Sequence, residues 1–600
     1  MPMEKNGGFT MAASQSNLSD PHYGFDLVVA VTQASVNVTL KELLLGLSAP
    51  EVTICYVYDQ NNNLVPIDYQ TLLLRAQGSD PFRVPNGTNP ATDKDLVNLA
   101  NANFAGAVRA KIGLPDVPLA NLPPIATFGN GTSAPVLFNL LCAEFAVTGF
   151  QYGPRGSATW VNASQPSGGS PWYFSSNVYL NSTTINPNSP VPPAIQERIA
   201  ELQHQVQNAF SIQKLFLDLD TAVLESVPRI VGVPEGWPVW NLITTVFLGS
   251  YLAELQKKGD PVLSYSFTLT SPRPTTLELG SVSRECCQLL DASGQPIANP
   301  TPAQKDAATL VYVGTQSATP PVPVPFAWNW MELNDVAAYA GVEAVRRDVF
   351  MSYFNGLINP SVGRLCQDTN VNLTHSGEDF TVRYSSKQSG SPQVFRPVMP
   401  VGAAGADGFT DVSSLTFTCN SHDDSTSATH AVEIWGDYNY NLKGTVALKS
   451  NQIRITVRAT VYMSFSHREV FVNYTDLGGA NYYDKTLTVV YTLGVDQNGA
   501  LQVTQANNVA DHSAHWDFST GGILGLIGAD SEVKKGLTSV QQNLGNYLDS
   551  AFTGYVGQMT DTINGYKAWV FAGNDAFTFK KVSFSQGLDL IAQLTYVNPS

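Results

Sequence analysis

The clearest pattern in the chain is a sustained alternation of apolar and polar residues between residues 432 and 465. From residue 432 to residue 448 the apolar or small residues occupy even positions, and from residue 453 to residue 465 they occupy odd positions. The polar residues 449–452 separate the two runs. A period of two on both sides of a polar break predicts a β-hairpin. Its arms, of about fifteen residues or roughly 45–50 Å, would be much longer than a usual strand of five or six residues.

The same alternation recurs elsewhere in the chain. It predicts further strands at residues 263–269, 487–495 and 588–596. The Asn498-Gly499 dipeptide that follows the second of these is a favoured hairpin turn. We therefore expect long sheets with one apolar face.

A helical period replaces the alternation near the C-terminus. Apolar residues recur in steps of three and four from Val533 to Tyr566, with Asp530 or Ser531 placed to cap the first turn. We expect a helix over residues 531–567, which would be about 55 Å long at 1.5 Å per residue and would match the strands. Its glycines, each costing up to about 1 kcal/mol, suit a backbone that lies close to a sheet. Further helices are predicted at residues 195–209 and 240–255.

A proline-rich segment, residues 316–325, divides the chain near its middle and is expected to be an extended linker. Long helices and alternating strands are predicted on both sides of it. We therefore expect two related halves, residues 21–315 and 326–600, preceded by a disordered tail over residues 1–20.

Composition narrows the function classes. Hydrophobic residues make up 43% of the chain, which allows a large core, and charged residues only 14%, against roughly 25% in an average globular protein. The net charge of −16 repels phosphate backbones, and the chain has no run of Lys and Arg, so a nucleic-acid partner is not expected. The first twenty residues contain no apolar run typical of a secretory signal, and no apolar stretch is long enough to span a membrane as a helix. The default expectation is a cytoplasmic protein, with non-classical release and peripheral membrane contact left open.

No enzyme motif is present: GxSxG, HExxH and GxxxxGK[ST] are all absent. His512 and His515 have the spacing of a metal pair without an evident third ligand, so a polar loop is the favoured interpretation. His422 near His430 favours a solvated turn in the same way. The glycine-rich segment 521–528 lacks the Lys that a phosphate loop requires. Its apolar residues favour a hinge packed on the sheet over a membrane-contacting tip. We therefore predict no catalytic residue, no metal site and no cofactor.

Several short segments, spread over most of the chain, carry a resemblance to a known family. They are residues 23–28 (YGFDLV), 37–40 (NVTL), 247–252, 261–263 (PVL), 326–330 (FAWNW), 341–350, 569–573 (WVFAG), 577–579 (FTF) and 589–590. Together they resemble the P-forty-seven and OrfX accessory proteins of clostridial neurotoxin gene clusters, which belong to the TULIP (tubular lipid-binding) superfamily.

This resemblance implies an α+β fold with an elongated TULIP-like architecture, in which long curved antiparallel β-sheets wrap around long α-helices. It also implies a non-enzymatic protein with an apolar groove for a lipid or another hydrophobic ligand. The expected groove residues come from the apolar stripes of the hairpin and the C-terminal helix; they are Ile453, Ile455, Val457, Val461, Met463, Leu537, Val540 and Leu544. The alternative is a structural or interaction protein with a filled groove, such as an accessory subunit of a toxin-like assembly with protein partners. Mixed side-chain sizes, such as Phe465 beside Ala459, leave both interpretations open.

Overall fold

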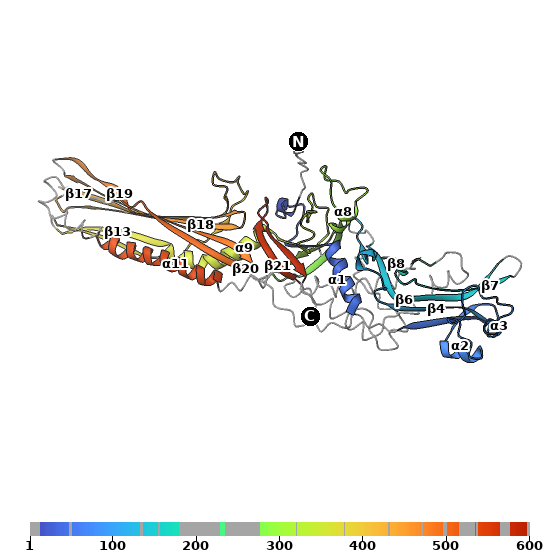
Figure 1. Ribbon diagram of the computed structural model, residues 1–600. Coiled ribbons are helices and arrows are strands. Elements are labelled where there is room, and N and C mark those ends of the chain that lie inside the picture. The colour runs from blue at the N-terminus through green and yellow to red at the C-terminus, as the bar shows by residue number, and fades with distance from the viewer. Residues whose placement is uncertain are drawn as a thin grey trace, which may run out of the picture.

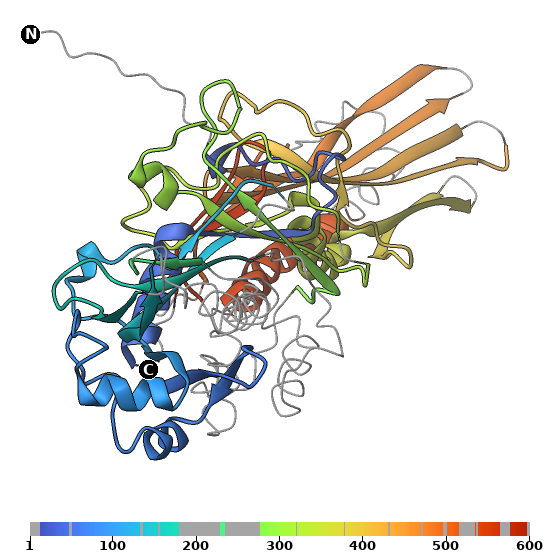
Figure 2. The same cartoon turned by 90° about the vertical axis from the view of Figure 1, so that its right-hand side faces the viewer.

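The computed structural model is an elongated α+β molecule with a central sheet and a wing on each side of it (Figure 1). We call the part built from residues 51–231 the N-terminal wing and the part built from residues 367–564 the C-terminal wing. The long strands of the C-terminal wing project to one side of the N-terminal wing (Figure 2). The structure describes residues 12–46, 51–131, 136–153, 157–178, 229–233, 277–319, 321–376, 379–429, 432–469, 472–495, 501–514, 535, 538–564 and 577–596.

The central sheet is antiparallel and takes strands from both sides of the proline-rich segment. Its order is β10-β11-β1-β12-β22-β21. The strands are β1 (Leu27–Thr32), β10 (Ser281–Cys287), β11 (Thr309–Thr315), β12 (Gly341–Val345), β21 (Phe577–Phe584) and β22 (Leu590–Tyr596). Every residue of β1 is buried, as expected for a strand covered on both faces. Strand β22 lies where the alternation predicts a strand. In this order β10, β11 and β1 precede the proline-rich segment in the sequence, and β12, β22 and β21 follow it.

Close packing and helices complete the centre. Strand β12 begins at Gly341, where a Cβ atom would collide with the carbonyl oxygen of Ala30 in β1. One face of β1 packs with α1 (Gln33–Gly46), which also contacts α8 (Pro302–Asp306). On the other face, Phe326, Trp328 and Trp330 form a ring cluster with centroids 4.9–5.5 Å apart.

The segment from residue 12 to residue 20 is ordered, contrary to the expectation of a disordered tail over residues 1–20. It contains a short 3-10 helix, Ala13–Gln15, and Leu18 is 1% exposed. The buried Asp589 carboxylate accepts hydrogen bonds from the Ser16 hydroxyl and the Leu18 amide, both at 2.6 Å. It also accepts one from the Arg347 amide at 3.1 Å. This single side chain therefore ties the N-terminal segment to the second half of the chain; residues 1–11 lie outside the described part.

The C-terminal wing is built on a six-stranded sheet of unusual length, with the order β15-β16-β17-β18-β19-β20. The strands are β15 (Arg396–Pro397), β16 (Thr410–Thr426), β17 (Val432–Lys449), β18 (Gln452–Glu469), β19 (Val472–Val495) and β20 (Leu501–Asp511). The predicted hairpin is confirmed, because Lys449 pairs with Gln452 across a two-residue turn in which Ser450 has φ +51. The strand predicted at residues 487–495 is also confirmed as part of β19. The turn at residues 498–499, the strand at 263–269 and the helices at 195–209 and 240–255 lie outside the described residues.

A separate hairpin lies against β16 and β17, and its contact with β16 uses side chains in place of a backbone ladder. It consists of β13 (Gln367–Ser376) and β14 (Asp379–Gln388), and it follows α9 (Arg347–Val362). The amides of Thr369, Val371 and Leu373 donate hydrogen bonds to side chains of β16. Their acceptors are Cys419 Sγ at 3.3 Å, Ser421 Oγ at 2.9 Å and Asp423 Oδ2 at 2.6 Å.

The predicted C-terminal helix is present over residues 538–564, beside the long sheet (Figure 1). It differs from the prediction in one respect: a π turn, Gln541–Gly545, precedes α11 (Asn546–Asn564). The buried stripe explains the difference. Val540, Leu544, Leu548 and Phe552 follow one another in steps of four, which would turn a regular helix by about 40° per step away from the sheet. A wider i→i+5 turn offsets that rotation and keeps the stripe on one side.

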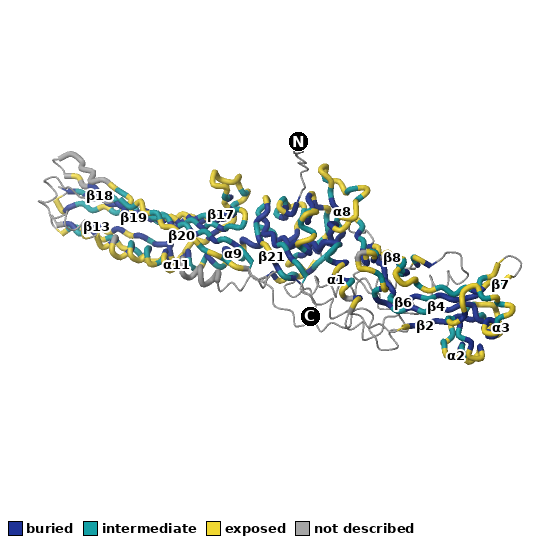
Figure 3. The backbone as a smooth tube through the Cα atoms, in the orientation of Figure 1, coloured by how far each residue is buried: buried dark blue, intermediate teal, exposed yellow. Residues whose placement is uncertain are grey.

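The N-terminal wing is an eight-stranded arrangement around the order β3-β2-β4-β6-β8-β9. Its strands are β2 (Val52–Tyr58), β3 (Leu64–Ile67), β4 (Phe104–Ile112), β5 (Ala126–Thr127), β6 (Val136–Tyr152), β7 (Ala158–Ser164), β8 (Tyr173–Val178) and β9 (Arg229–Val231). Two short helices, α2 (Tyr69–Arg75) and α3 (Lys94–Asn101), are capped by Asp68 and Asp93. A band of buried residues continues from this wing through the central sheet into the C-terminal wing (Figure 3).

Candidate functional site

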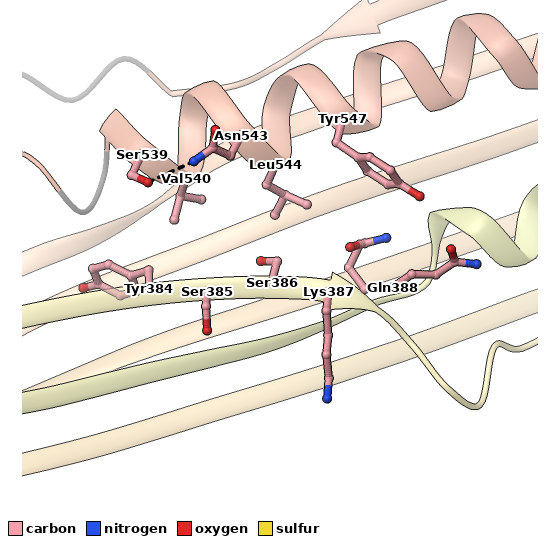
Figure 4. A pocket seen from close by; sticks show the side chains of 11 residues that line it. Tyr384, Ser385, Ser386, Lys387, Gln388, Ser539, Val540, Asn543, Leu544 and Tyr547 are labelled. Carbon is pink, nitrogen blue, oxygen red and sulfur yellow. Dashed lines mark hydrogen bonds between the residues drawn. The ribbon is translucent and has the colours of Figure 1, made fainter.

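Two hollows flank the beginning of the long helix in the C-terminal wing. The larger, which we call the β14 hollow, has a volume of about 430 Å³ and lies between the helix and the end of β14 (Figure 4). The smaller, the β19 hollow, has a volume of about 180 Å³ and lies between the helix, β19 and the end of β20. Val540 and Leu544 line both hollows, so the same apolar stripe separates them.

Strand alternation decides which side chains of β14 face the helix. Figure 4 shows Ser386 directed toward the helix, and Ser385 and Lys387 directed to the opposite side of the strand. From the helix, Val540 and Leu544 point toward the strand. These two apolar side chains, 6% and 5% exposed, form the apolar part of the β14 hollow.

Uncharged polar groups surround this apolar part. Gln367 Nε2 and the Tyr547 hydroxyl both donate to the carbonyl oxygen of Arg364, each at 3.1 Å. Asn543 Nδ2 donates to the Ser539 hydroxyl at 3.1 Å. On β14, Ser386 makes a short hydrogen bond with the Tyr438 hydroxyl. The rim thus consists of amides and hydroxyls held in place by neighbouring groups.

The β19 hollow has a different character, because an ionic cluster borders it. Lys485 Nζ lies 2.9 Å from both carboxylate oxygens of Asp549 and 3.4 Å from Asp511 Oδ2. The Tyr483 hydroxyl donates to Asp549 Oδ1 at 2.9 Å. Burial alone would lower the pKa of Lys485, but the hydrogen bonds and charges of Asp549 and Asp511 outweigh it and raise that pKa. Burial, together with the Asp549 carboxylate, raises the pKa of Tyr483. This cluster joins α11 to β19 and β20.

The residues predicted to line an apolar groove divide into three groups. Val461 lines the β19 hollow, and Val540 and Leu544 line both hollows. Leu537 lies outside the described residues. The remaining four belong to the packed core and not to these two hollows, with exposures of 0–1%: Ile453, Ile455, Val457 and Met463.

Buried tyrosine side chains lie between the long sheet and the elements that cover it. Tyr438, Tyr440, Tyr491 and Tyr555 are among the largest fully buried side chains of the described residues. The Tyr440 hydroxyl donates to the carbonyl oxygen of Leu365, the last residue of the 3-10 turn Gly363–Leu365 that follows α9. Burial raises the pKa of Tyr438 to about 12. Among the described residues, these rings therefore fill part of the interior, and the two hollows leave it open beside residues 539–549.

Sequence reasoning missed the polar residues of both hollows. Along β14 the alternation changes from Phe380, Val382 and Tyr384 to Ser386 and Gln388 on the same face. That change from apolar to polar within one strand is a readable signal for the end of a filled core. The ionic cluster had no such signal, because Lys485, Asp511 and Asp549 are far apart in the sequence.

The candidate metal residues do not converge in the described part of the chain. His422 Nδ1 lies 2.9 Å from Asp437 Oδ1, and Asp423 accepts the Leu373 amide. Within the described ranges there is no group of three or more His, Cys, Asp or Glu side chains that could hold a metal ion. His430, His515 and segment 521–528 lie outside those ranges.

Among the residues that the structure describes, no helix has the length and apolar character needed to cross a membrane.

Comparisons with known proteins add little to this geometry. No protein-family model matches the chain, and no curated protein matches it. A solved structure described as "Crystal structure of lipopolysaccharide binding protein" aligns over 96% of this chain and 99% of its own. The sequence identity is 8% and the TM-score is 0.26. At so low a TM-score the likeness carries no argument about fold or function.

Proposed function

We propose that the C-terminal wing binds a lipid or another hydrophobic small molecule against its long helix, without catalysis, in a TULIP-like architecture. The observation that carries this proposal is that one buried apolar stripe, Val540 and Leu544, borders open space on both of its sides. A volume of about 430 Å³ falls in the range of small-molecule sites, about 300–1,000 Å³.

The energetics suit a ligand with an apolar chain. Each methylene group that leaves water contributes about 0.8 kcal/mol, so a chain of several carbons can offset the cost of ordering the ligand. The β13–β14 hairpin forms one wall, and side-chain hydrogen bonds from β16 hold it there. Such a wall can adjust to a ligand without breaking a backbone ladder.

A second candidate is a structural or interaction protein, for example an accessory subunit of a larger assembly. The buried tyrosines between sheet and helix favour it, because they leave little space for a long ligand deep in the wing. A cytoplasmic location and protein partners remain predictions from the sequence.

The deciding experiment is organic extraction of the purified protein, mass spectrometry of the extract, and titration with a fluorescent fatty acid. We expect a co-purifying amphiphile or saturable uptake of the probe. Leu544→Trp should fill the larger hollow and weaken uptake by about tenfold or more. Ser550→Trp places the same ring on an exposed helical position and should leave uptake unchanged. An empty extract together with no uptake would favour the second candidate.

A further inference from the structure

The β14 hollow also indicates the chemical class of its ligand. We propose that it takes a single-chain amphiphile whose head group is uncharged and carries hydroxyl or amide groups. This inference rests on the proposed function, because it assigns a ligand class to the same hollow.

The first argument is the charge around the hollow. Of the described residues that line it, Lys387 alone is charged, and its side chain points to the opposite side of β14 (Figure 4). Lys535, four residues before Ser539, is exposed and does not line the hollow. A charged head group at this rim would lose part of its hydration without gaining an ionic partner, which costs free energy. The chain's net charge of −16 further disfavours an anionic ligand.

The helix dipole does not change this conclusion. Its attraction for anions falls off within the first turn of a helix. The chain is already helical at Lys535, whereas the hollow is lined by residues from Ser539 to Tyr547. Asn543, Leu544 and Tyr547, which line most of the helix side of the hollow, therefore lie past the first turn.

The second argument is the hydrogen-bonding inventory. Gln367, Gln388 and Asn543 each carry an amide with both donors and an acceptor, and Ser386 and Ser539 carry hydroxyls. Known bonds use one amide nitrogen of Gln367 and one of Asn543, so their carbonyl oxygens are not engaged by these bonds. Groups that both donate and accept match hydroxyl and amide head groups, which also do both.

The third argument is the position of the apolar surface. Val540 and Leu544 lie together on the helix side, while Ser539 and Asn543 are exposed at the rim. A ligand would therefore place its chain against the stripe and its head between the rim amides and water. The β19 hollow lacks this arrangement, since Lys485 and Asp549 already pair with each other beside it.

The test compares amphiphiles that share a dodecyl chain and differ in head group. Dodecyl maltoside, dodecanoate and dodecyltrimethylammonium are titrated into the full-length protein below their micelle thresholds, with binding followed by calorimetry. We expect dodecyl maltoside to bind at least about tenfold more tightly than either charged amphiphile. Equal or tighter binding of dodecanoate or dodecyltrimethylammonium would overturn the head-group inference and leave the proposed function standing. Binding of none of the three would overturn both.

A pair of matched variants locates the effect. Ser539→Lys places a cation at the rim and should shift the preference toward dodecanoate by about tenfold. Ser385→Lys places the same cation on the opposite side of β14 and should leave the preference unchanged. If the two variants shift the preference equally, the charge acts at long range and the head group does not sit in the β14 hollow.

Discussion

In the N-terminal wing two short helices lie on a sheet whose aromatic side chains contact one another. In the C-terminal wing, by comparison, one long helix lies against a longer sheet and leaves hollows beside it. The rings of Phe104, Phe150 and Trp160 have centroids 5.0–6.3 Å apart. Trp160 is 1% exposed, and its indole nitrogen donates to the Val84 carbonyl oxygen at 3.2 Å. Beside Val540 and Leu544, Tyr384 and Tyr547 line the β14 hollow and Tyr482 and Tyr483 line the β19 hollow, and these rings leave open space on both sides of the stripe.

The difference shows that, in this molecule, the space between helix and sheet is less completely packed where the helix is longer. Short helices such as α2 and α3 can each settle into the local shape of a twisted sheet. A single helix of 19 residues preceded by a π turn has one axis along its whole length. A twisted sheet therefore moves away from that axis toward one end of the helix. Space then opens where the helix begins, which is where both hollows lie.

The largest effect is expected from a charge placed in the core of the C-terminal wing. Val457 is 0% exposed on the inner face of β18, so Val457→Asp would bury an unpaired charge at a cost of several kcal/mol. We expect an insoluble or unfolded C-terminal wing, measured by hydrogen exchange in residues 432–469. Thr456→Asp places the same charge one residue away, on the other face of the strand, and should be tolerated. An unchanged melting temperature for Val457→Asp would contradict the register of β18.

The second prediction compares truncations in the two wings. Trp160→Ala leaves a cavity in a filled interior and should cost about 3–5 kcal/mol. Leu544→Ala removes a side chain that already borders open space. It should therefore lower the free energy of unfolding by about 2 kcal/mol, at the low end for a Leu→Ala change. Urea unfolding of both variants measures the two costs. Equal costs would show that the hollows are closed in solution.

The third prediction uses the sheet that both wings share. Burial raises the pKa of Glu285 in β10 to about 8, from an ordinary value near 4.5. Because the folded state favours the protonated carboxyl, its stabilising contribution is complete below about pH 4.5 and is lost as the pH rises through about 8. We expect Glu285→Gln to be more stable than the wild type at alkaline pH, on the order of a few kcal/mol.

Thermal unfolding of both proteins at about pH 5 and about pH 9 measures this difference in stability. The wild type should lose stability relative to Glu285→Gln between the two conditions. A change confined to one wing would contradict the view that the central sheet couples both. A constant difference between the two proteins would place the Glu285 pKa near its ordinary value.

The smallest expected effect concerns the ionic cluster beside the β19 hollow. Lys485→Met removes the cation between Asp549 and Asp511 and should destabilise the C-terminal wing by about 1 kcal/mol, because the cluster is only partly buried. Arg83→Met removes a largely exposed cation beside Asp80 in the N-terminal wing and should change stability little. Denaturant midpoints at low and high salt test the pair. A salt-independent loss for Lys485→Met would assign its role to packing.

Within the described residues, local periodicity predicted the hairpin of β17 and β18, the second half of β19, and β22. The alternation that changes from even to odd numbers across residues 449–452 is sufficient to give the register of β17 and β18, because a shift of one residue would expose Val457. The helix was predictable from its stripe, but the π turn was not. The π turn keeps the apolar stripe facing the neighbouring sheet. The helical period in the sequence does not say where that sheet lies, so it could not predict the turn.

Contacts between distant segments could not be predicted. Residues of β13 bond to residues of β16 that lie 50 positions later, and the alternating polar side chains of β16 look like the outer face of a solvated strand. The same applies to Lys485 and Asp549, whose 64-residue separation gives no pattern. In the candidate site, therefore, the apolar stripe followed from the sequence and the polar rim did not.

The order of strands in the central sheet has a consequence for synthesis on the ribosome. Strand β1 is made near the beginning of the chain, yet its neighbours β11 and β12 are made some three hundred residues later. Strand β12 in turn pairs with β22, at residues 590–596. The emerging chain must therefore keep an apolar strand, LVVAVT, without these partners for about half of translation, at about 5–20 residues per second. We expect this strand to be the segment that a chaperone protects during synthesis, and slowed elongation to increase aggregation of nascent chains.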